Sequence, residues 1–132
     1  MCVTPDGSKA YVANYGSGTV SVINTSNNTV SATITVGTQP LGVAVGPDGT
    51  KCYVGNNGSN NVSVINTSNN TVSATITVGT NPYGVSVTPD GTELYVANQG
   101  SNNISVVNTS NNTISATITV GTNPVAFGSF IS

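Results

Sequence analysis

The sequence predicts an all-β fold that is built from three copies of one four-stranded antiparallel unit. Apolar residues alternate with polar ones, as in Val30, Ala32 and Ile34, and this period of two is typical of half-buried strands. Clusters of Asn, Gly, Ser and Pro separate these runs and supply the conformations that tight turns need. Two motifs recur every 42 residues: Pro-Asp-Gly at 5–7, 47–49 and 89–91, and Tyr-Val-(Ala/Gly)-Asn at 11–14, 53–56 and 95–98.

Each copy has room for four short strands. The expected first strands are 41–46 and 83–88, the second 9–14, 51–56 and 93–98, the third 19–24, 61–66 and 103–108, and the fourth 30–35, 72–77 and 114–119. Small residues such as Gly42 and Ala44 in the first strand suit strands that converge on an axis, whereas Thr and Ser in the fourth suit an exposed outer edge. Four antiparallel strands in a repeat of this length predict the blade of a β-propeller.

The repeat sets the expected organisation of the chain. Blade 1 covers about residues 1–36, blade 2 about 37–78, blade 3 about 79–120, and residues 121–132 form a closing segment. A propeller closes with typically four to eight blades, and six is the only multiple of three in that range. We therefore expect a six-bladed ring that is formed by two copies of the chain.

The two ends of the chain predict how such a homodimer closes. By register, Phe127 corresponds to Val85 and to Met1, so the C-terminal segment reads as the inner strand of a further blade. We expect it to complete blade 1 of the partner, with two-fold symmetry. The closing residues are then Val125, Ala126, Phe127, Gly128, Ser129 and Phe130 of one chain and Met1, Cys2 and Val3 of the other. The alternative is that the sequence is a piece of a longer single-chain propeller.

The charged residues exclude several classes of function. The 132 residues include two Lys, four acidic residues and no His or Arg, with a net charge of −2. No imidazole base is available, and two lysines cannot neutralise a nucleic-acid backbone. No apolar run has the length of a membrane span. We therefore expect no catalytic residues, no cofactor, no nucleic-acid partner and no membrane span.

Asp6, Asp48 and Asp90 are the only weak candidates for a metal site. They would form a ring of six carboxylates in the dimer, and oxygen ligands suit a cation such as calcium. The simpler interpretation is that each Asp hydrogen-bonds its own Pro-Asp-Gly turn.

Positions at which the blades differ are the better places to look for a specific site, because residues shared by all three blades are explained by the fold. These sets are Tyr15/Asn57/Gln99, Lys9/Lys51/Glu93, Ala10/Cys52/Leu94, Leu41/Tyr83/Val125 and Thr4/Gly46/Thr88. Cys2 and Cys52 stand in small or apolar positions and are expected to pack as small residues.

Tyr-Val-Ala-Asn, Ser-Val-Ile-Asn-Thr, Thr-Val-Ser-Ala-Thr-Ile-Thr-Val-Gly and Asn-Pro-Tyr-Gly-Val-Ser-Val-Thr-Pro-Asp-Gly follow one another along the chain. They resemble the YVTN-repeat β-propellers of archaeal surface-layer and bacterial cell-surface proteins. The resemblance implies an extracellular or cell-surface location and a non-enzymatic scaffold that acts in structure, adhesion or interaction with a protein or glycan. The alternative function is a propeller that binds a small ligand or metal in its channel.

Overall fold

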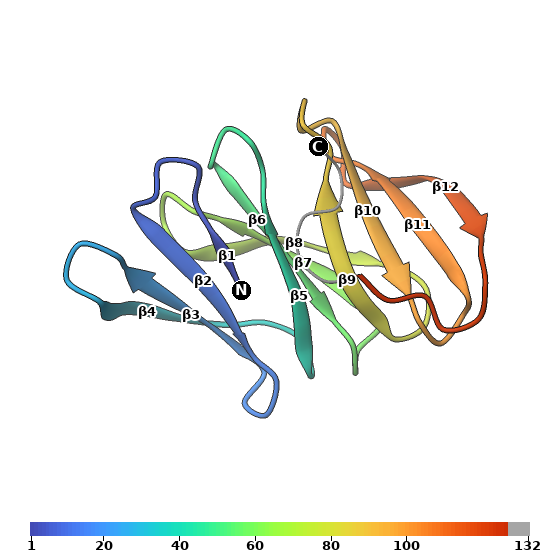
Figure 1. Cartoon of the computed structure of the whole chain (residues 1–132), viewed down its shortest axis with the longest axis horizontal. Coiled ribbons are helices and arrows are strands. Elements are labelled where there is room, and N and C mark those ends of the chain that lie inside the picture. Colours follow the sequence, from blue (N-terminus) through green and yellow to red (C-terminus); the bar gives the residue numbers. More distant parts are fainter. Residues whose placement is uncertain (127–132) are drawn as a thin grey trace.

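The computed structural model describes residues 1–126, which form twelve strands and no helix (Figure 1). Blade 1 contains β1 (Cys2–Val3), β2 (Lys9–Asn14), β3 (Thr19–Asn24) and β4 (Thr29–Thr35). Blade 2 contains β5 (Pro40–Val45), β6 (Lys51–Asn56), β7 (Asn61–Asn66) and β8 (Thr71–Thr77). Blade 3 contains β9 (Pro82–Val87), β10 (Glu93–Asn98), β11 (Asn103–Asn108) and β12 (Thr113–Thr119).

Each blade is a separate antiparallel sheet whose strands follow chain order. The predicted second and third strands have the observed bounds, and the first and fourth begin one residue earlier than predicted. The prediction of an all-β propeller chain with three four-stranded blades is confirmed.

Asparagine side chains hold the hairpins of each blade. In blade 2 the Asn56 side-chain amide donates to Asn61 Oδ1 at 2.8 Å and to Ser63 Oγ at 2.9 Å, which ties together the hairpin between β6 and β7. The next turn is closed by Asn66 Oδ1, which accepts from the Ser68 amide at 3.0 Å. Asn70 completes that turn with a φ of 56°, a conformation that Asn tolerates well. The motif asparagines therefore fix the register of the strands.

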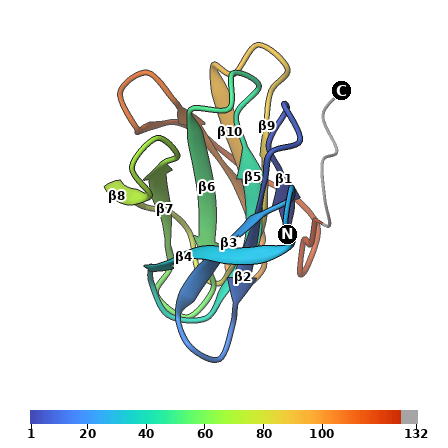
Figure 2. The ribbon, with the colours of Figure 1, turned by 90° about the vertical axis from the view of Figure 1, so that its left-hand side faces the viewer.

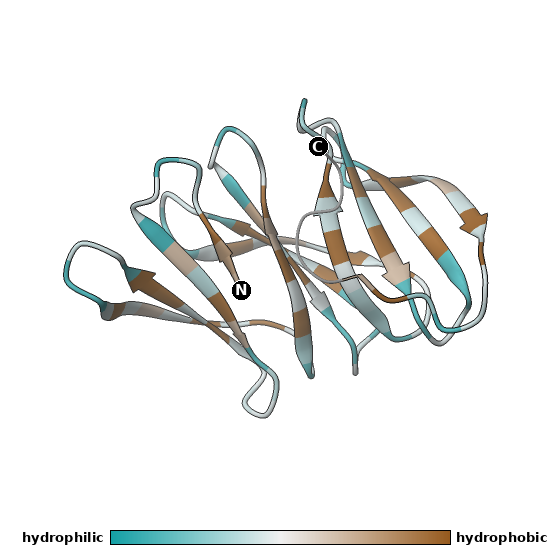
Figure 3. Ribbon diagram, viewed as in Figure 1, coloured by the Kyte–Doolittle hydropathy of each residue, from teal (hydrophilic) through white to brown (hydrophobic). Residues whose placement is uncertain are grey.

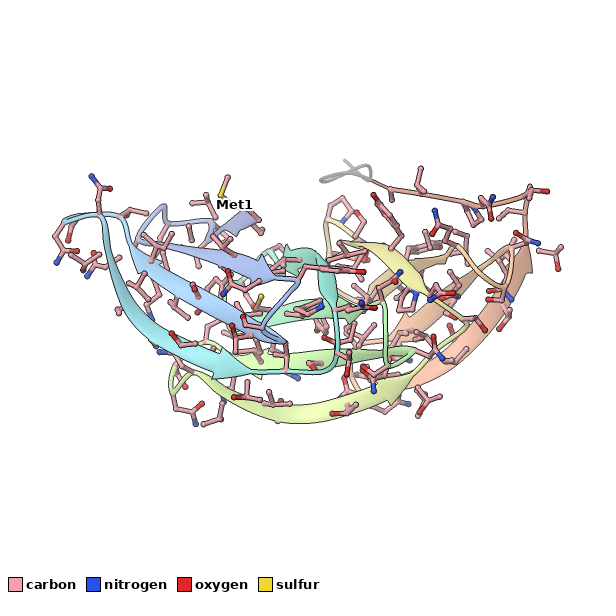
Figure 4. The ribbon with its side chains drawn as sticks, turned by 90° about the horizontal axis from the view of Figure 1, so that it is seen from below. Met1 is labelled. Carbon is pink, nitrogen blue, oxygen red and sulfur yellow. The ribbon has the colours of Figure 1, made fainter. Side chains whose placement is uncertain are left out.

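The three blades splay like part of a fan, with the inner strands on the concave side and β4, β8 and β12 along the outer curve (Figure 4). The inner strands approach one another closely. A Cβ atom on Gly42 would lie 2.9 Å from the carbonyl oxygen of Tyr83 and 3.0 Å from Cα of Gly84. Glycine is therefore required where β5 and β9 converge.

The hydrophobic core lies between the blades. Apolar and polar residues alternate along many of the strands (Figure 3). One cluster joins blades 1 and 2 through Tyr11, Val20, Val22, Ile34, Cys52, Val54 and Ile65. The other joins blades 2 and 3 through Tyr53, Val62, Val64, Ile76, Val85, Leu94, Val96 and Val107. Most members of the two clusters correspond to each other at a spacing of 42 residues. The same interface is thus used twice.

The outer faces of blades 1 and 3 lack a neighbouring blade. Val12 is half-buried because no blade lies before blade 1, whereas its counterpart Val54 is fully buried against blade 1. At the other end of the chain Ala126 lies against Gly84, where a Cβ on that glycine would collide with it. Ala126 therefore occupies the place of the inner strand of a fourth blade. The other predicted closing residues, Phe127, Gly128, Ser129 and Phe130, lie outside the described residues.

Candidate functional site

The three Pro-Asp-Gly turns hold their aspartates in local hydrogen bonds. Asp6 Oδ1 accepts from Thr4 Oγ1 at 2.6 Å and from the amide and hydroxyl of Ser8 at 3.0 and 2.8 Å. Hydrogen bonds from the Thr4 hydroxyl, and then from Ser8, lower the pKa of Asp6 to about 2. Asp90 has the same arrangement with Thr88 and Thr92, and its pKa is also about 2.

Asp48 differs from the other two because Gly46 stands where they have a threonine. Its Oδ1 accepts only from the Thr50 amide at 2.9 Å and the Thr50 hydroxyl at 2.8 Å, and these bonds also lower its pKa. Within residues 1–126 no three His, Cys, Asp or Glu side chains are grouped so that they could hold a metal ion. The structure therefore places the candidate aspartates in three separate turns.

Small cavities lie beside these turns, where one blade meets the next. The cavity between blades 2 and 3, of about 190 Å³, is lined by Asp48, Lys51, Tyr53 and Asp90 among others. Its counterpart between blades 1 and 2, of about 230 Å³, contains Asp6, Lys9 and Asp48. There the Lys9 ammonium donates to the carbonyl of Thr67 at 3.3 Å and so ties blade 1 to blade 2. We call this end of the blades, which carries the three Pro-Asp-Gly turns, the turn end.

A different pocket lies where the inner strands converge near the starts of β5 and β9. It has a volume of about 180 Å³ and is lined by Met1, Leu41, Gly42, Val43, Tyr83, Gly84, Val85 and Ala126. We call it the axial pocket. Leu41 and Tyr83 belong to a set of positions at which the blades differ, so the structure brings part of that set together. Lys9 and Lys51 lie at the turn end, beyond the opposite ends of the inner strands, and among the described residues no charged side chain lines the axial pocket.

The two cysteines stand in different surroundings. Cys52 is fully buried between blades 1 and 2, and this burial raises the pKa of its thiol. Cys2 is half-buried in β1, and both thiols are free. Because the thiolate is the reactive form, Cys52 is chemically inert while the blades stay packed.

The chain is similar to known propellers. Residues 28–127 match the family described as "Lactonase, 7-bladed beta-propeller". Kuenenia stuttgartiensis hydrazine synthase superimposes with a TM-score of 0.90 and 32% identity, over 93% of this chain and 36% of that one. A putative 6-phosphogluconolactonase from Bacteroides uniformis has a TM-score of 0.79 and 25% identity, over 94% of this chain and 40% of that one. Another putative 6-phosphogluconolactonase, from Bacteroides fragilis, shares the fold at 23% identity with a TM-score of 0.79, over 93% of this chain and 39% of that one.

The chain spans less than half the length of these solved structures. No curated protein matches it in sequence. Among the described residues, none forms a helix with the length and apolarity needed to cross a membrane.

One sequence-based prediction is corrected by these matches. The expectation that the chain is not an enzyme is wrong, because the matched family is an enzyme-related one that carries the name of a lactonase. That expectation rested on missing catalytic side chains, whereas the match covers residues 28–127 as a whole. The propeller part of the YVTN resemblance is confirmed. The cell-surface location and the protein or glycan partner stay predictions.

Proposed function

Because the chain belongs to the lactonase family of seven-bladed propellers, we propose that it supplies three blades and part of the ligand-binding wall of a ring that acts on a cyclic ester. The observation that supports this most is the axial pocket, where the inner strands β5 and β9 meet Met1 and Ala126. Ligand sites are concave, mostly apolar and equipped with a few polar groups, and the axial pocket has this composition.

The pocket chemistry favours an uncharged ligand. Its wall consists of aliphatic side chains, glycine backbone and the ring of Tyr83, whose amphipathic side chain can pack and hydrogen-bond at once. A phosphorylated ligand is best held by cationic side chains, and both lysines lie at the turn end. A neutral sugar lactone therefore suits this wall better than a sugar phosphate. In this proposal, the described residues bind and orient the cyclic ester.

The test is a titration of the 15N-labelled chain with glucono-δ-lactone, with gluconate as the matched open-chain control. We expect saturable shifts of the amide signals of Gly42, Tyr83 and Gly84 with the lactone and weaker shifts with gluconate. Tyr83→Leu should reduce the affinity at least several-fold. Equal binding of lactone and gluconate, or lactone shifts that leave the axial pocket unchanged, would contradict the proposal.

The ring also needs further blades, and for the 132-residue chain we propose a second copy as the partner. Two copies give six blades, one fewer than the family's description states. The open face of blade 3 carries Tyr95, Ile104 and Ile118, the counterparts of residues with which blade 2 contacts blade 3. A cavity of about 300 Å³ lies on this face. The open face of blade 1 carries the counterparts of the blade 3 residues that contact blade 2. Blade 1 of one copy is thus the complementary surface for blade 3 of another.

Solution mass tests this assembly. Light scattering should give about twice the 13.2 kDa of one chain. Ile118→Asp should yield a folded monomer, because this side chain is exposed in the single chain and would be buried in the dimer. Ile114→Asp is the matched control on the same strand, since its counterparts Val30 and Val72 stay exposed beside neighbouring blades. A wild-type monomer, or an Ile118→Asp dimer of unchanged affinity, would refute the assembly without bearing on lactone binding.

A further inference from the structure

A cavity lies between blades 1 and 2, at the end opposite the Pro-Asp-Gly turns. Figure 2 shows the β2–β3 hairpin at the lower end of blade 1, far from the β1–β2 hairpin at the top. The cavity has a volume of about 560 Å³. It is bounded by the hairpin 15–18, by the linker 35–39 between the blades, and by Ser59 and Asn61 of the next hairpin. We call it the Tyr15 cleft.

The equivalent junction between blades 2 and 3 is closed by asparagine side chains. Asn60 Oδ1 accepts from the Asn81 amide at 2.9 Å, and the Asn81 side-chain amide donates to the Asn57 carbonyl at 3.2 Å. The Asn57 side-chain amide donates in turn to the Pro82 carbonyl at 3.2 Å. The following linker repeats the main bond, from the Asn123 amide to Asn102 Oδ1 at 2.9 Å. These bonds fasten each linker to the preceding hairpin.

Blade 1 departs from this pattern at three positions that meet in the Tyr15 cleft. Tyr15 replaces Asn57, Gly18 replaces Asn60, and Gln39 replaces Asn81. Gly18 has no side chain to accept a bond, and the Gln39 backbone N–H donates to no other described residue. The bonds that do not involve these side chains are kept, such as Thr38 N–H to Ser59 Oγ at 3.1 Å and Asn57 N–H to the Gln39 carbonyl at 2.9 Å. The two junctions therefore share these backbone contacts, but the first junction lacks the side-chain acceptor for the N–H of residue 39.

The lining of the cleft indicates which ligand could supply that acceptor. Tyr15 is 47% exposed and offers one aromatic face. Hydroxyls of Ser17 and Thr38 and the amide of Gln39 offer neutral donors and acceptors, and no lining residue is charged. A sugar ring has matching chemistry, with apolar C–H faces for a tyrosine and hydroxyls for the amides.

We infer that the Tyr15 cleft is a binding site for a neutral glycoside. One hydroxyl oxygen of the sugar accepts from the Gln39 backbone N–H and so replaces the carboxamide oxygen that Asn60 supplies at the next junction. The sugar ring packs on Tyr15, and the Gln39 side chain contacts a second hydroxyl. This site is separate from the axial pocket and does not depend on the proposed lactone binding.

The test is an NMR titration of the 15N-labelled 132-residue chain with methyl glucoside, methyl galactoside, methyl mannoside and N-acetylglucosamine. At least one glycoside should give saturable shifts at Gly16, Gly18, Gln39 and Ser59. Tyr15→Ala should weaken binding at least tenfold, while Tyr15→Phe, which keeps the ring, should stay within about threefold of the wild type. Signals of Gly42 and Gly84 report separately on the axial pocket.

The chain itself offers a matched control. The triple variant Tyr15→Asn, Gly18→Asn and Gln39→Asn gives the first junction the residues of the second. It should fold, because Gly18 has a φ of 66° and Asn60 adopts 59° at the equivalent position. The variant should be at least as heat-stable as the wild type and should lose the glycoside shifts. The inference is overturned if none of the four glycosides gives a saturable shift in the wild-type cleft, or if the triple variant binds as well as the wild type.

Discussion

The outer halves of blades 2 and 3 have almost the same sequence and very different surroundings. Residues 63–82 and 105–124 differ only by exchanges of Val and Ile. Nevertheless, Ile76 is 5% exposed and Ile118 is 45% exposed. Strand β12 is exposed along its whole length, whereas β8 has a buried residue where blade 3 covers it. The exposure of these residues thus depends on whether a neighbouring blade covers them, and not on the sequence of their own strand.

This difference explains why one blade has no core of its own. A single four-stranded sheet presents two apolar faces and can cover neither, so stacking of blades creates the core. The middle blade has both faces covered, and each end blade has one. The same substitution should therefore change the free energy of unfolding by different amounts in blades 2 and 3. The difference between the two values indicates how far the open face of blade 3 is covered.

The largest expected effect is on the stability of the core between blades 2 and 3. Ile76→Ala should lower the free energy of unfolding by about 2–5 kcal/mol, because it opens a cavity in a packed cluster. Ile118→Ala should cost less than about 1 kcal/mol in the single chain. Urea unfolding of both variants at low protein concentration measures the two values.

The same pair of variants also tests the assembly. At concentrations at which two copies associate, the cost of Ile118→Ala should rise toward that of Ile76→Ala, since Ile118 then lies under blade 1 of the partner. A cost of Ile118→Ala that does not change with protein concentration would mean that its face stays uncovered.

A smaller effect is expected on the reactivity of the two cysteines. Their labelling rates compare a covered blade face with an open one. Cys52 lies inside the blade 1–blade 2 cluster, and burial raises the pKa of its thiol, whereas Cys2 lies in the short β1. Labelling by iodoacetamide should be on the order of 100-fold slower at Cys52 than at Cys2, because it requires the blades to open. Mass spectrometry of Cys2→Ser and Cys52→Ser follows each thiol alone. Equal rates at the two sites in the folded protein would show that blade 1 does not stay packed on blade 2.

The smallest effect is expected from a substitution that makes the turn of blade 2 equal to the other two. Gly46→Thr should give Asp48 the hydroxyl donor that Asp6 and Asp90 already have, and a Cβ at this position meets Asp48 and Lys51 only at 3.7 Å. The pKa of Asp48 should then fall toward the value of about 2 of the other two turns. Gly46→Ala is the control without a hydroxyl.

The sign of the pH dependence follows from these lowered pKa values. Each turn aspartate has a folded pKa below the ordinary 3.8, so its contribution to stability is present above pH 4 and is lost as the pH falls toward 2. Gly46→Thr should steepen this loss slightly. Carboxyl chemical shifts and thermal melts between pH 2 and 5 give both quantities, and an unchanged Asp48 titration would contradict the role of the hydroxyl.

Most of the fold could be predicted from the sequence because strand period, turn residues and repeat spacing agree at every blade. The bounds of β2 and β3 follow directly from Lys9–Asn14 and Thr19–Asn24, where alternation is strict. The unequal burial of Ile76 and Ile118 could not be predicted in this way, because it depends on which blade lies beside each strand.

The site was harder to predict. The sets chosen from the sequence include Tyr15 and Leu41/Tyr83. They leave out Gly18 and Gln39, although these positions also differ between the blades. The proposed role of these two residues depends on the Asn60–Asn81 bond at the next junction. The enzyme prediction failed because it considered only catalytic side chains, whereas the family match extends over residues 28–127. Counting catalytic side chains in three blades does not detect such a match.

The four-residue asparagine turns have a consequence for how the chain folds. Strands β7 and β11 have nearly the same sequence, so β7 could pair with β12 almost as well as with β8. The correct pairing closes residues 67–70, whereas the wrong one would close residues 67–112. The difference in loop-closure entropy favours the short loop by about 2 kcal/mol. Asn66 and Asn70 pre-form that short loop, so the turns select the right partner strand among copies that packing alone could not tell apart.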